Sequence, residues 1–350
     1  IGKELTAPVT EALIRKNPDS TPLYLYLAVS RLTLMNAADF QNIRNRGDGI
    51  EGITARQLEL VEDMPEGLEE MCAALVEAVG ERINPSMCQR AVSYLALSRL
   101  GLRLTDLESL LETEQITFQT LEFAQFVNYM NELFLLRADG RYDFLHKSLR
   151  QGLLRHMTAT GMNLTEGHEK IVSHLESLPD DDIIQIQEIT WESMQADDPY
   201  SFYHWLSHIW SCTGDEKAAA ARDIAEKCRE DEGLWIAGCM EGLWEMDYTE
   251  RDRNQMLVMG AHFLAVQVCS RFGDSLQENR TKIRIGKAAV SNMERLAQEN
   301  PSELNLLTLS ESCRVLAGYY LKSDQPAERD QAVPLLEQGR RLMSQRLHRN

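Results

Sequence analysis

The sequence predicts a predominantly α-helical protein that carries one β-hairpin. Apolar residues recur at helical spacing in most segments of the 350-residue chain, and Pro, Gly, Asp or Asn breaks separate these segments. Residues 133–136 and 142–145 differ, because they are short apolar runs on either side of Asp139-Gly140. Asp-Gly supplies the positive φ angles of a tight hairpin turn, so these runs predict two antiparallel strands.

Residues 1–83 predict a helical domain. Thr21 is a suitable N-cap, and Pro22 suits the first position of a helix that runs to about residue 36. A glycine-rich loop at residues 46–49 follows. A long helix then extends over residues 65–83, with apolar residues at helical spacing: Leu68, Met71, Cys72, Leu75 and Val79.

Residues 84–160 predict a winged-helix domain. Gly101 ends its first helix, and Thr105 caps the second. The helices are predicted in three segments: residues 88–100, 107–111 and 118–130. Three helices followed by a hairpin are typical of a winged helix. His146 and an apolar helical segment come directly after the hairpin.

Residues 161–350 predict helices alone, and breaks at Pro, Gly and Asp separate them. Paired helices without strands indicate α-helical hairpins that stack as a solenoid, similar to tetratricopeptide repeats. Solenoids of this kind present extended binding surfaces. We therefore expect a protein partner to bind through this region.

The net charge argues against two classes of partner. The net charge of −18 opposes sequence-independent binding to nucleic acid or to an anionic membrane. The third helix of the winged helix, residues 118–130, contains Glu122 and no Lys or Arg. A helix that reads the major groove of DNA needs basic residues. We expect neither nucleic acid nor a membrane as a partner.

The cysteine pattern predicts a cytoplasmic protein. The seven cysteines are scattered and never form a C-x-x-C motif, which indicates buried, reduced thiols. No segment reaches the roughly 20 apolar residues that span a bilayer. The N-terminus also lacks the basic region and apolar core of a signal peptide.

The first 160 residues resemble part of a known family. Four short segments occur in this order: Gly2-Lys3-Glu4-Leu5, Ser20-Thr21-Pro22-Leu23-Tyr24-Leu25, Met64-Pro65 before the long helix, and Tyr142-Asp143-Phe144-Leu145-His146-Lys147-Ser148-Leu149 after the wing. Their succession resembles the C-terminal half of the nucleotide module in STAND-type signalling ATPases, the NACHT and NB-ARC proteins. The resemblance implies that residues 1–83 are a helical lid, and that lid and winged helix close over ADP on a preceding P-loop domain.

The resemblance also implies two residues that contact the nucleotide. The proline of the family's Pro-Leu-x-Leu element packs on adenine and corresponds to Pro22. The histidine just after the wing contacts the terminal phosphate of ADP and corresponds to His146. Both residue types suit these roles. The rigid apolar ring of proline suits the face of a base, and imidazole donates hydrogen bonds to anionic oxygens. Two alternatives stay open: Pro22 as a helix starter, and His146 as a helix-start residue that bonds to local backbone.

The chain departs from the family at the catalytic motifs. It lacks the P-loop G-x-x-x-x-G-K-[ST], and no apolar strand ends in the paired acidic residues that hold Mg²⁺. Residues 47–52 are glycine-rich, but no Lys and Thr follow, so they predict a loop. We expect no enzyme activity from this chain. ADP or ATP would be its cofactor only in a longer protein, with an upstream P-loop domain in cis.

Neither a metal site nor a nucleophile is predicted. His204 and His208 have the i, i+4 spacing of a zinc site, but the Glu of H-E-x-x-H and a third ligand are missing. Packing of an aromatic-rich helix is the favoured interpretation. No G-x-S-x-G or Cys/His signature occurs, so no catalytic residue is predicted.

Three functions follow from these observations. The leading hypothesis is a regulatory fragment of a STAND-type switch that closes over ADP and binds a protein through its helical repeats. The alternative is a non-enzymatic interaction scaffold whose winged helix is structural. A transcription regulator is the weaker alternative.

Overall fold

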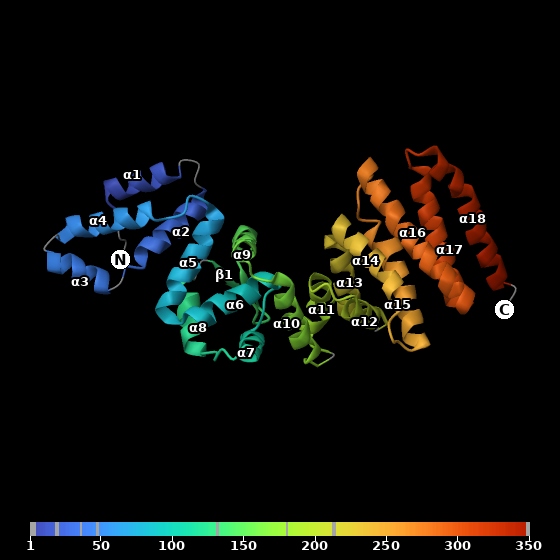
Figure 1. Ribbon diagram of the computed structural model, residues 1–350, viewed down its shortest axis with the longest axis horizontal. Helices are drawn as coiled ribbons and strands as arrows, with labels where there is room; N and C mark the ends of the chain where they lie inside the picture. Colours follow the sequence, from blue (N-terminus) through green and yellow to red (C-terminus); the bar gives the residue numbers. More distant parts are fainter. Residues whose placement is uncertain are drawn as a thin grey trace. The chain divides into compact units, whose positions relative to one another are not determined.

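The computed structural model describes residues 5–17, 21–35, 37–46, 49–130, 133–179, 181–211 and 215–347. These residues form 18 α-helices and one antiparallel hairpin of two strands (Figure 1), which confirms the predicted fold class. Two compact units are present, Ile1–His174 (unit 1) and Leu175–Asn350 (unit 2). The predicted domain boundaries after residues 83 and 160 stay predictions. Among the described helices, none has the length and apolar character needed to cross a membrane.

Five helices form the first part of unit 1. They are α1 (Ala7–Lys16), α2 (Pro22–Thr33), α3 (Ala37–Arg46), α4 (Gly49–Glu62) and α5 (Leu68–Ile83). As predicted, α2 begins at Pro22, and the Thr21 side chain caps it by accepting a 3.3 Å hydrogen bond from the Tyr24 N–H. The Tyr24 hydroxyl donates to the carbonyl oxygen of Pro65 at 2.6 Å, and α2 packs against α5.

Two expectations for this part are wrong. Residues 49–52 belong to helix α4 and not to a loop, whereas Gly47 and Asp48 lie outside the described residues. Packing of α4 against α1 and α3 overrides the low helix propensity of its glycines. The long helix α5 begins at Leu68 and not at Pro65, because Gly67 is its N-cap.

The winged helix follows in the predicted order. Its elements are α6 (Pro85–Leu97), α7 (Leu104–Thr113), α8 (Thr120–Tyr129), β1 (Phe134–Leu136), β2 (Tyr142–Phe144) and α9 (Lys147–Ala159). The strands pair in the register Phe134↔Phe144 and Leu136↔Tyr142. A single bridge adds Leu102 to the hairpin, since its N–H donates to the Tyr142 carbonyl at 3.1 Å and its carbonyl accepts from the Tyr142 N–H at 2.8 Å.

The hairpin turn differs from the prediction in one detail. The Arg137 N–H donates to the Arg141 carbonyl at 2.8 Å, so the loop closed by this bond has three residues, 138–140, and is longer than the Asp-Gly pair alone. Gly140 has a φ of +84°, but Asp139 does not adopt a positive φ. Three-residue hairpin loops need a single left-handed residue after a type I turn, which explains why glycine alone takes this conformation.

Helix α7 begins earlier than the sequence suggests. Its N-cap is Arg103 and not Thr105, because the Arg103 N–H donates to the Asp106 carboxylate at 2.8 Å. Asp106 is 1% exposed and also lies 3.1 Å from Nε2 of His174 in α10 (Leu164–Glu176). Burial alone would raise the pKa of Asp106, but the hydrogen bonds from His174 and Arg103 outweigh burial and lower it to about 2. This carboxylate therefore joins α10 to the winged helix.

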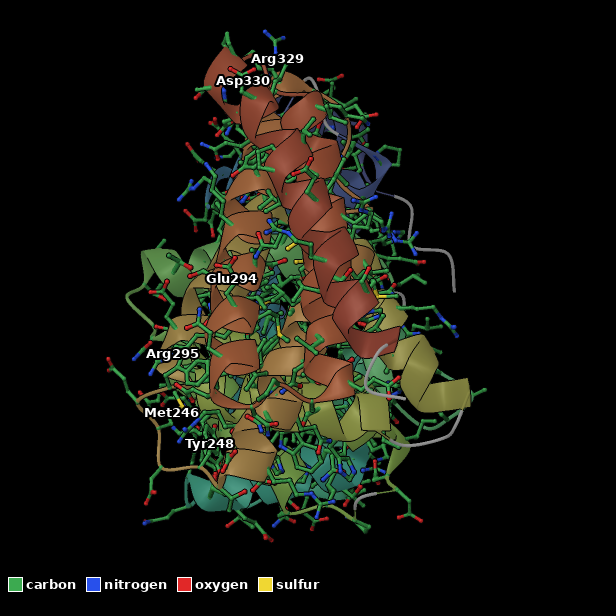
Figure 2. The ribbon with its side chains drawn as sticks, turned by 90° about the vertical axis from the view of Figure 1, so that its right-hand side faces the viewer. Met246, Tyr248, Glu294, Arg295, Arg329 and Asp330 are labelled. Carbon is green, nitrogen blue, oxygen red and sulfur yellow. The ribbon has the colours of Figure 1, made fainter. Side chains whose placement is uncertain are left out.

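Unit 2 is built from helices alone over its described residues. Its elements are α11 (Ile183–Gln195), α12 (Pro199–Ser211), α13 (Asp215–Lys227), α14 (Glu230–Gly242), α15 (Glu250–His262), the π-helical segment η1 (Phe263–Val268), α16 (Leu276–Glu299), α17 (Glu303–Leu321) and α18 (Pro326–Leu347). Helices α14 to α18 pack on their next or next-but-one neighbours, which is the arrangement of stacked helical pairs. Figure 2 faces this stack, with Glu294 and Arg295 on α16 and Arg329 at the start of α18.

The described cysteines are free thiols that lie within helices or, for Cys228 and Cys269, directly after one. All are buried except the half-buried Cys239, while Cys212 lies outside the described residues. Burial raises the pKa of Cys72 and Cys269 to about 12 and that of Cys88 to about 11. These thiols therefore stay protonated at neutral pH, which is the state of a packed core residue and not of a nucleophile.

Two glycines test how much the wing depends on its bridge to Leu102. Gly101 and Gly140 both have positive φ, but a Cβ on Gly101 would overlap the Tyr142 carbonyl oxygen, whereas Gly140 has open space around it. We expect Gly140→Ala to lower the free energy of unfolding of unit 1 by about 1 kcal/mol, and Gly101→Ala by about 3 kcal/mol or more. Urea unfolding followed by far-UV circular dichroism measures both values.

Hydrogen exchange of residues 100–145 locates the effect, and unit 2 provides an internal control. All five tryptophans lie in unit 2, so their fluorescence reports that unit. Equal losses of stability in the two alanine variants would contradict the assigned role of the Leu102–Tyr142 bridge.

Candidate functional site

Pro22 lies at the first position of α2, where its ring is exposed. The cap from Thr21 and the buried Tyr24 side chain fix the start of this helix. Pro22 therefore has the local role of a helix starter, and its ring is also accessible to a ligand. Both interpretations of Pro22 stay open on this geometry.

His146 is the N-cap residue of α9 and comes two residues after the end of β2. Its backbone is extended, with φ −119° and ψ 128°, and its carbonyl accepts a 3.0 Å hydrogen bond from the Leu149 N–H. The imidazole is exposed and makes no capping hydrogen bond. The backbone of His146 thus begins the helix, while its side chain stays accessible. No hydrogen bond joins His146 to Pro22, although α2 and α9 both pack against α5.

Asp143 holds the segment that leads to His146, and the sequence analysis does not identify it. This carboxylate is 5% exposed and accepts hydrogen bonds from Arg137 at 2.5 and 3.2 Å and from the Phe144 N–H at 2.7 Å. Arg137 binds Oδ2, whereas Arg150 of α9 forms an ion pair with Oδ1, the oxygen that also accepts from Phe144. Arg150 also donates to the Arg99 carbonyl at 2.6 Å. One buried carboxylate therefore joins the wing, the start of α9 and the segment that follows α6.

The sequence carries a signal for this network. Asp143 is the only charged residue inside the short apolar run Tyr142-Asp143-Phe144, and burial of a strand forces such a carboxylate to find partners. Arginines seven residues later and six residues earlier supply them. Only the folded structure, however, shows that both arginines reach the Asp143 carboxylate.

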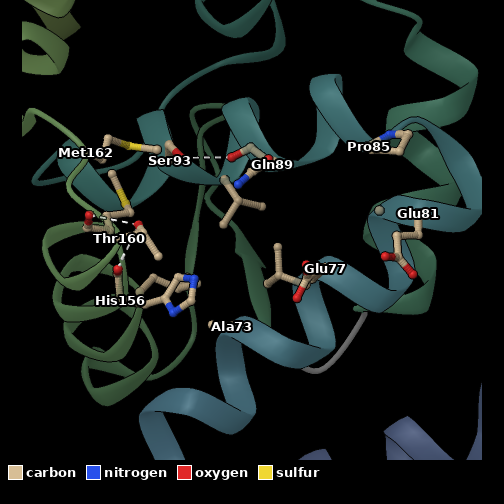
Figure 3. A pocket seen from close by; sticks show the side chains of 14 residues that line it. Ala73, Glu77, Glu81, Pro85, Gln89, Ser93, His156, Thr160 and Met162 are labelled. Carbon is tan, nitrogen blue, oxygen red and sulfur yellow. Dashed lines mark hydrogen bonds between the residues drawn. The ribbon is translucent and has the colours of Figure 1, made fainter.

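A pocket of about 200 Å³ opens between α5, α6 and α9, and it too is missing from the sequence analysis (Figure 3). Its floor is apolar and includes Ala73, Val76, Val92, Leu153 and Met157. Its rim is polar and includes Glu77, Glu81, Gln89, His156 and Thr160. Figure 3 shows the two glutamates on α5 and the His156 ring extending from α9 toward that helix.

Two glycines bring the three helices together beside this pocket. A Cβ on Gly80 of α5 would lie 3.3 Å from the Cβ of Cys88 in α6. A Cβ on Gly152 of α9 would lie 2.9 Å from the Cα of Glu69 in α5, which is closer than real side chains approach. Gly80 and Leu153, the neighbour of Gly152, both line the pocket. Close helix packing at these two points therefore gives the pocket its walls.

The two histidines at zinc-site spacing pack against an aromatic ring. The rings of His204 and His208 both meet Trp205 edge-on, with centroids 5.3 and 5.4 Å apart. Over the residues that the structure describes, no three His, Cys, Asp or Glu side chains are grouped in a way that could hold a metal ion. This geometry supports the interpretation as aromatic packing.

Comparison with protein families, with curated proteins and with solved structures finds no match for this chain.

Replacement of the buried carboxylate tests its role as the hub of the wing. Asp143→Asn leaves Arg137 and Arg150 without their anionic partner, so we expect unit 1 to lose about 3 kcal/mol of stability. Hydrogen exchange should rise in β2 and in the first turn of α9, which includes His146. Glu59→Gln is the matched control, because it also lies in unit 1 and both side chains of its pair with Arg56 are more than a third exposed. A loss in the control as large as that in Asp143→Asn would refute the assignment.

Proposed function

We propose that this chain is the regulatory part of a STAND-type nucleotide switch and is not itself an enzyme. In this proposal α1 to α5 form a lid, the winged helix follows, and both close over ADP on a P-loop domain supplied in cis. The helical array of unit 2 binds a protein partner. The protein acts in the cytoplasm, and neither nucleic acid nor a membrane is its target.

The observation that carries the proposal is the position of His146. It comes directly after a wing that the Asp143 network fixes in place, and its imidazole is exposed and makes no capping hydrogen bond. A histidine in this place is free to donate to an anionic phosphate oxygen. The exposed ring of Pro22, at the capped start of α2, adds an apolar surface of the kind that a base packs on.

The second candidate is an interaction scaffold with a structural winged helix. The Asp143 network favours it, because that network explains the wing and the start of α9 without any nucleotide. The scaffold and the switch differ in one measurable property, since only the switch couples His146 to nucleotide exchange. No observation favours a transcription regulator, because α8 contains neither Lys nor Arg.

The chain alone should have no ATPase activity and should bind Mg²⁺-ADP weakly or not at all, because it lacks the P-loop that cradles the phosphates. Isothermal titration of the purified chain with Mg²⁺-ADP and a phosphate-release assay measure the two properties. Tight binding of ADP to the chain alone would overturn the proposal that a P-loop domain in cis supplies the phosphate site.

In a protein that carries this chain after a P-loop domain, His146→Ala should speed ADP release. Loss of a hydrogen bond to a charged group costs about 1.5–3 kcal/mol, so we expect release at least about tenfold faster. Stopped-flow exchange of a fluorescent ADP analogue measures the rate. His146→Gln keeps a hydrogen-bond donor and should restore part of the retention.

Gln151→Ala is the control for this experiment, because Gln151 is an exposed residue of the same helix. It should leave the release rate unchanged. If His146→Ala lowers the melting temperature while ADP release keeps its original rate, the sensor role is wrong and the scaffold is favoured.

A further inference from the structure

The pocket between α5, α6 and α9 has two glutamates on its rim and no Lys or Arg in its lining. Glu77 and Glu81 lie one helical turn apart on α5, and both are exposed. None of the residues that line the pocket is Lys or Arg. Arg31 of α2 lies within electrostatic range of both carboxylates, but it forms an ion pair with neither. The rim therefore attracts a cation that the pocket itself does not supply.

The floor of the same pocket suits one apolar group. Val76, Leu153 and Met157 line it and yet are at most 7% exposed, so the pocket reaches the core between the helices. Its volume of about 200 Å³ is below the roughly 300–1,000 Å³ of pockets that bind drug-sized ligands. A single large side chain is a better match for this size. Met157 and Met162 are flexible and polarisable, so the pocket can adapt to different apolar side chains.

We propose that this pocket binds a short basic segment of a partner protein. One apolar side chain of the segment enters the floor, and neighbouring Lys or Arg side chains pair with Glu77 and Glu81. Gln89 and His156, on the other sides of the rim, provide hydrogen-bonding groups for the backbone of the segment. This inference goes beyond the nucleotide switch and does not depend on it, because no nucleotide contact is involved.

Charge complementarity is the argument for a basic occupant. The chain carries a net charge of −18, which steers cationic partners toward it, and the pocket combines that field with two local carboxylates. A small organic amine offers the same local chemistry, but it lacks the several cations that a segment presents together. The experiment below therefore compares basic peptides with a small amine.

The test uses an array of fluorescent nine-residue peptides whose central residue varies and whose flanking residues are Lys and Arg. Fluorescence anisotropy with the purified chain measures binding. Peptides with central Leu, Met or Phe should bind, and the same peptides with central Ser should bind at least about tenfold more weakly, because they bury no large apolar side chain in the floor. Affinity should fall with rising salt, since the pairs on the rim are exposed and screened.

Two variants examine the two parts of the pocket. Glu77→Gln/Glu81→Gln keeps the shape and removes the charge, so we expect about tenfold weaker binding of the Leu peptide. Ala73→Leu fills the floor and should abolish the preference for an apolar central residue. Glu108→Gln/Glu112→Gln on α7 is the matched control, because these two exposed glutamates also lie one turn apart in unit 1. It should change the affinity less than about twofold.

Three results would overturn the inference. The first is an unchanged affinity for the Leu peptide in the Glu77→Gln/Glu81→Gln variant, provided that circular dichroism shows that the variant keeps its helices. The second is an apolar preference that persists in Ala73→Leu. The third is binding of isopentylamine when no basic peptide of the array binds. Loss of amine binding in both variants would show that the amine occupies this pocket. None of these outcomes depends on ADP, so they are independent of the test of His146.

Discussion

The arrangement of the winged helix depends on one buried carboxylate. Asp143 lies inside β2, and a charge in that position is costly to bury unless its oxygens are fully paired. Arg137, Arg150 and the Phe144 N–H satisfy it. Because Arg150 also binds the Arg99 carbonyl, the same group links the hairpin to α9 and to the segment after α6. The positions of the wing and of His146 therefore share a single electrostatic cause.

Helix α5 gives unit 1 its second organising constraint. It packs against α2, α6, α8 and α9, so the predicted lid and the predicted winged helix meet along it. Glycines at both contacts, Gly80 toward α6 and Gly152 toward α9, bring the backbones close and leave a pocket beside them. A ligand in that pocket would touch elements of both predicted domains. It would shift a switch only as far as its affinity differs between two arrangements of these helices.

The sequence predicts those features that depend on neighbours in the chain. The cap at Thr21, the start of α2 at Pro22 and the order of three helices before the hairpin are local patterns, and the structure confirms them. The expectation of Thr105 as a cap fails because the buried Asp106 takes the Arg103 N–H, and its other partner, His174, is 68 residues away. The pocket could not be predicted from the sequence for the same reason. Its walls come from three helices, and no periodicity within one helix indicates which faces will diverge.

The charges of the wing also bear on what a winged helix can do in this protein. Arg137 and Arg141 are the cations nearest the hairpin turn, and both are engaged, the first by Asp143 and the second by Asp139 at 2.5 Å. Each guanidinium is thus neutralised by a carboxylate of the same hairpin. Binding of DNA phosphates by Arg137 and Arg141 would need these pairs to break, at a cost that α8, which has no Lys or Arg, does not offset. An intramolecular contact or a protein partner requires no such change, and this difference favours a winged helix that acts through protein surfaces.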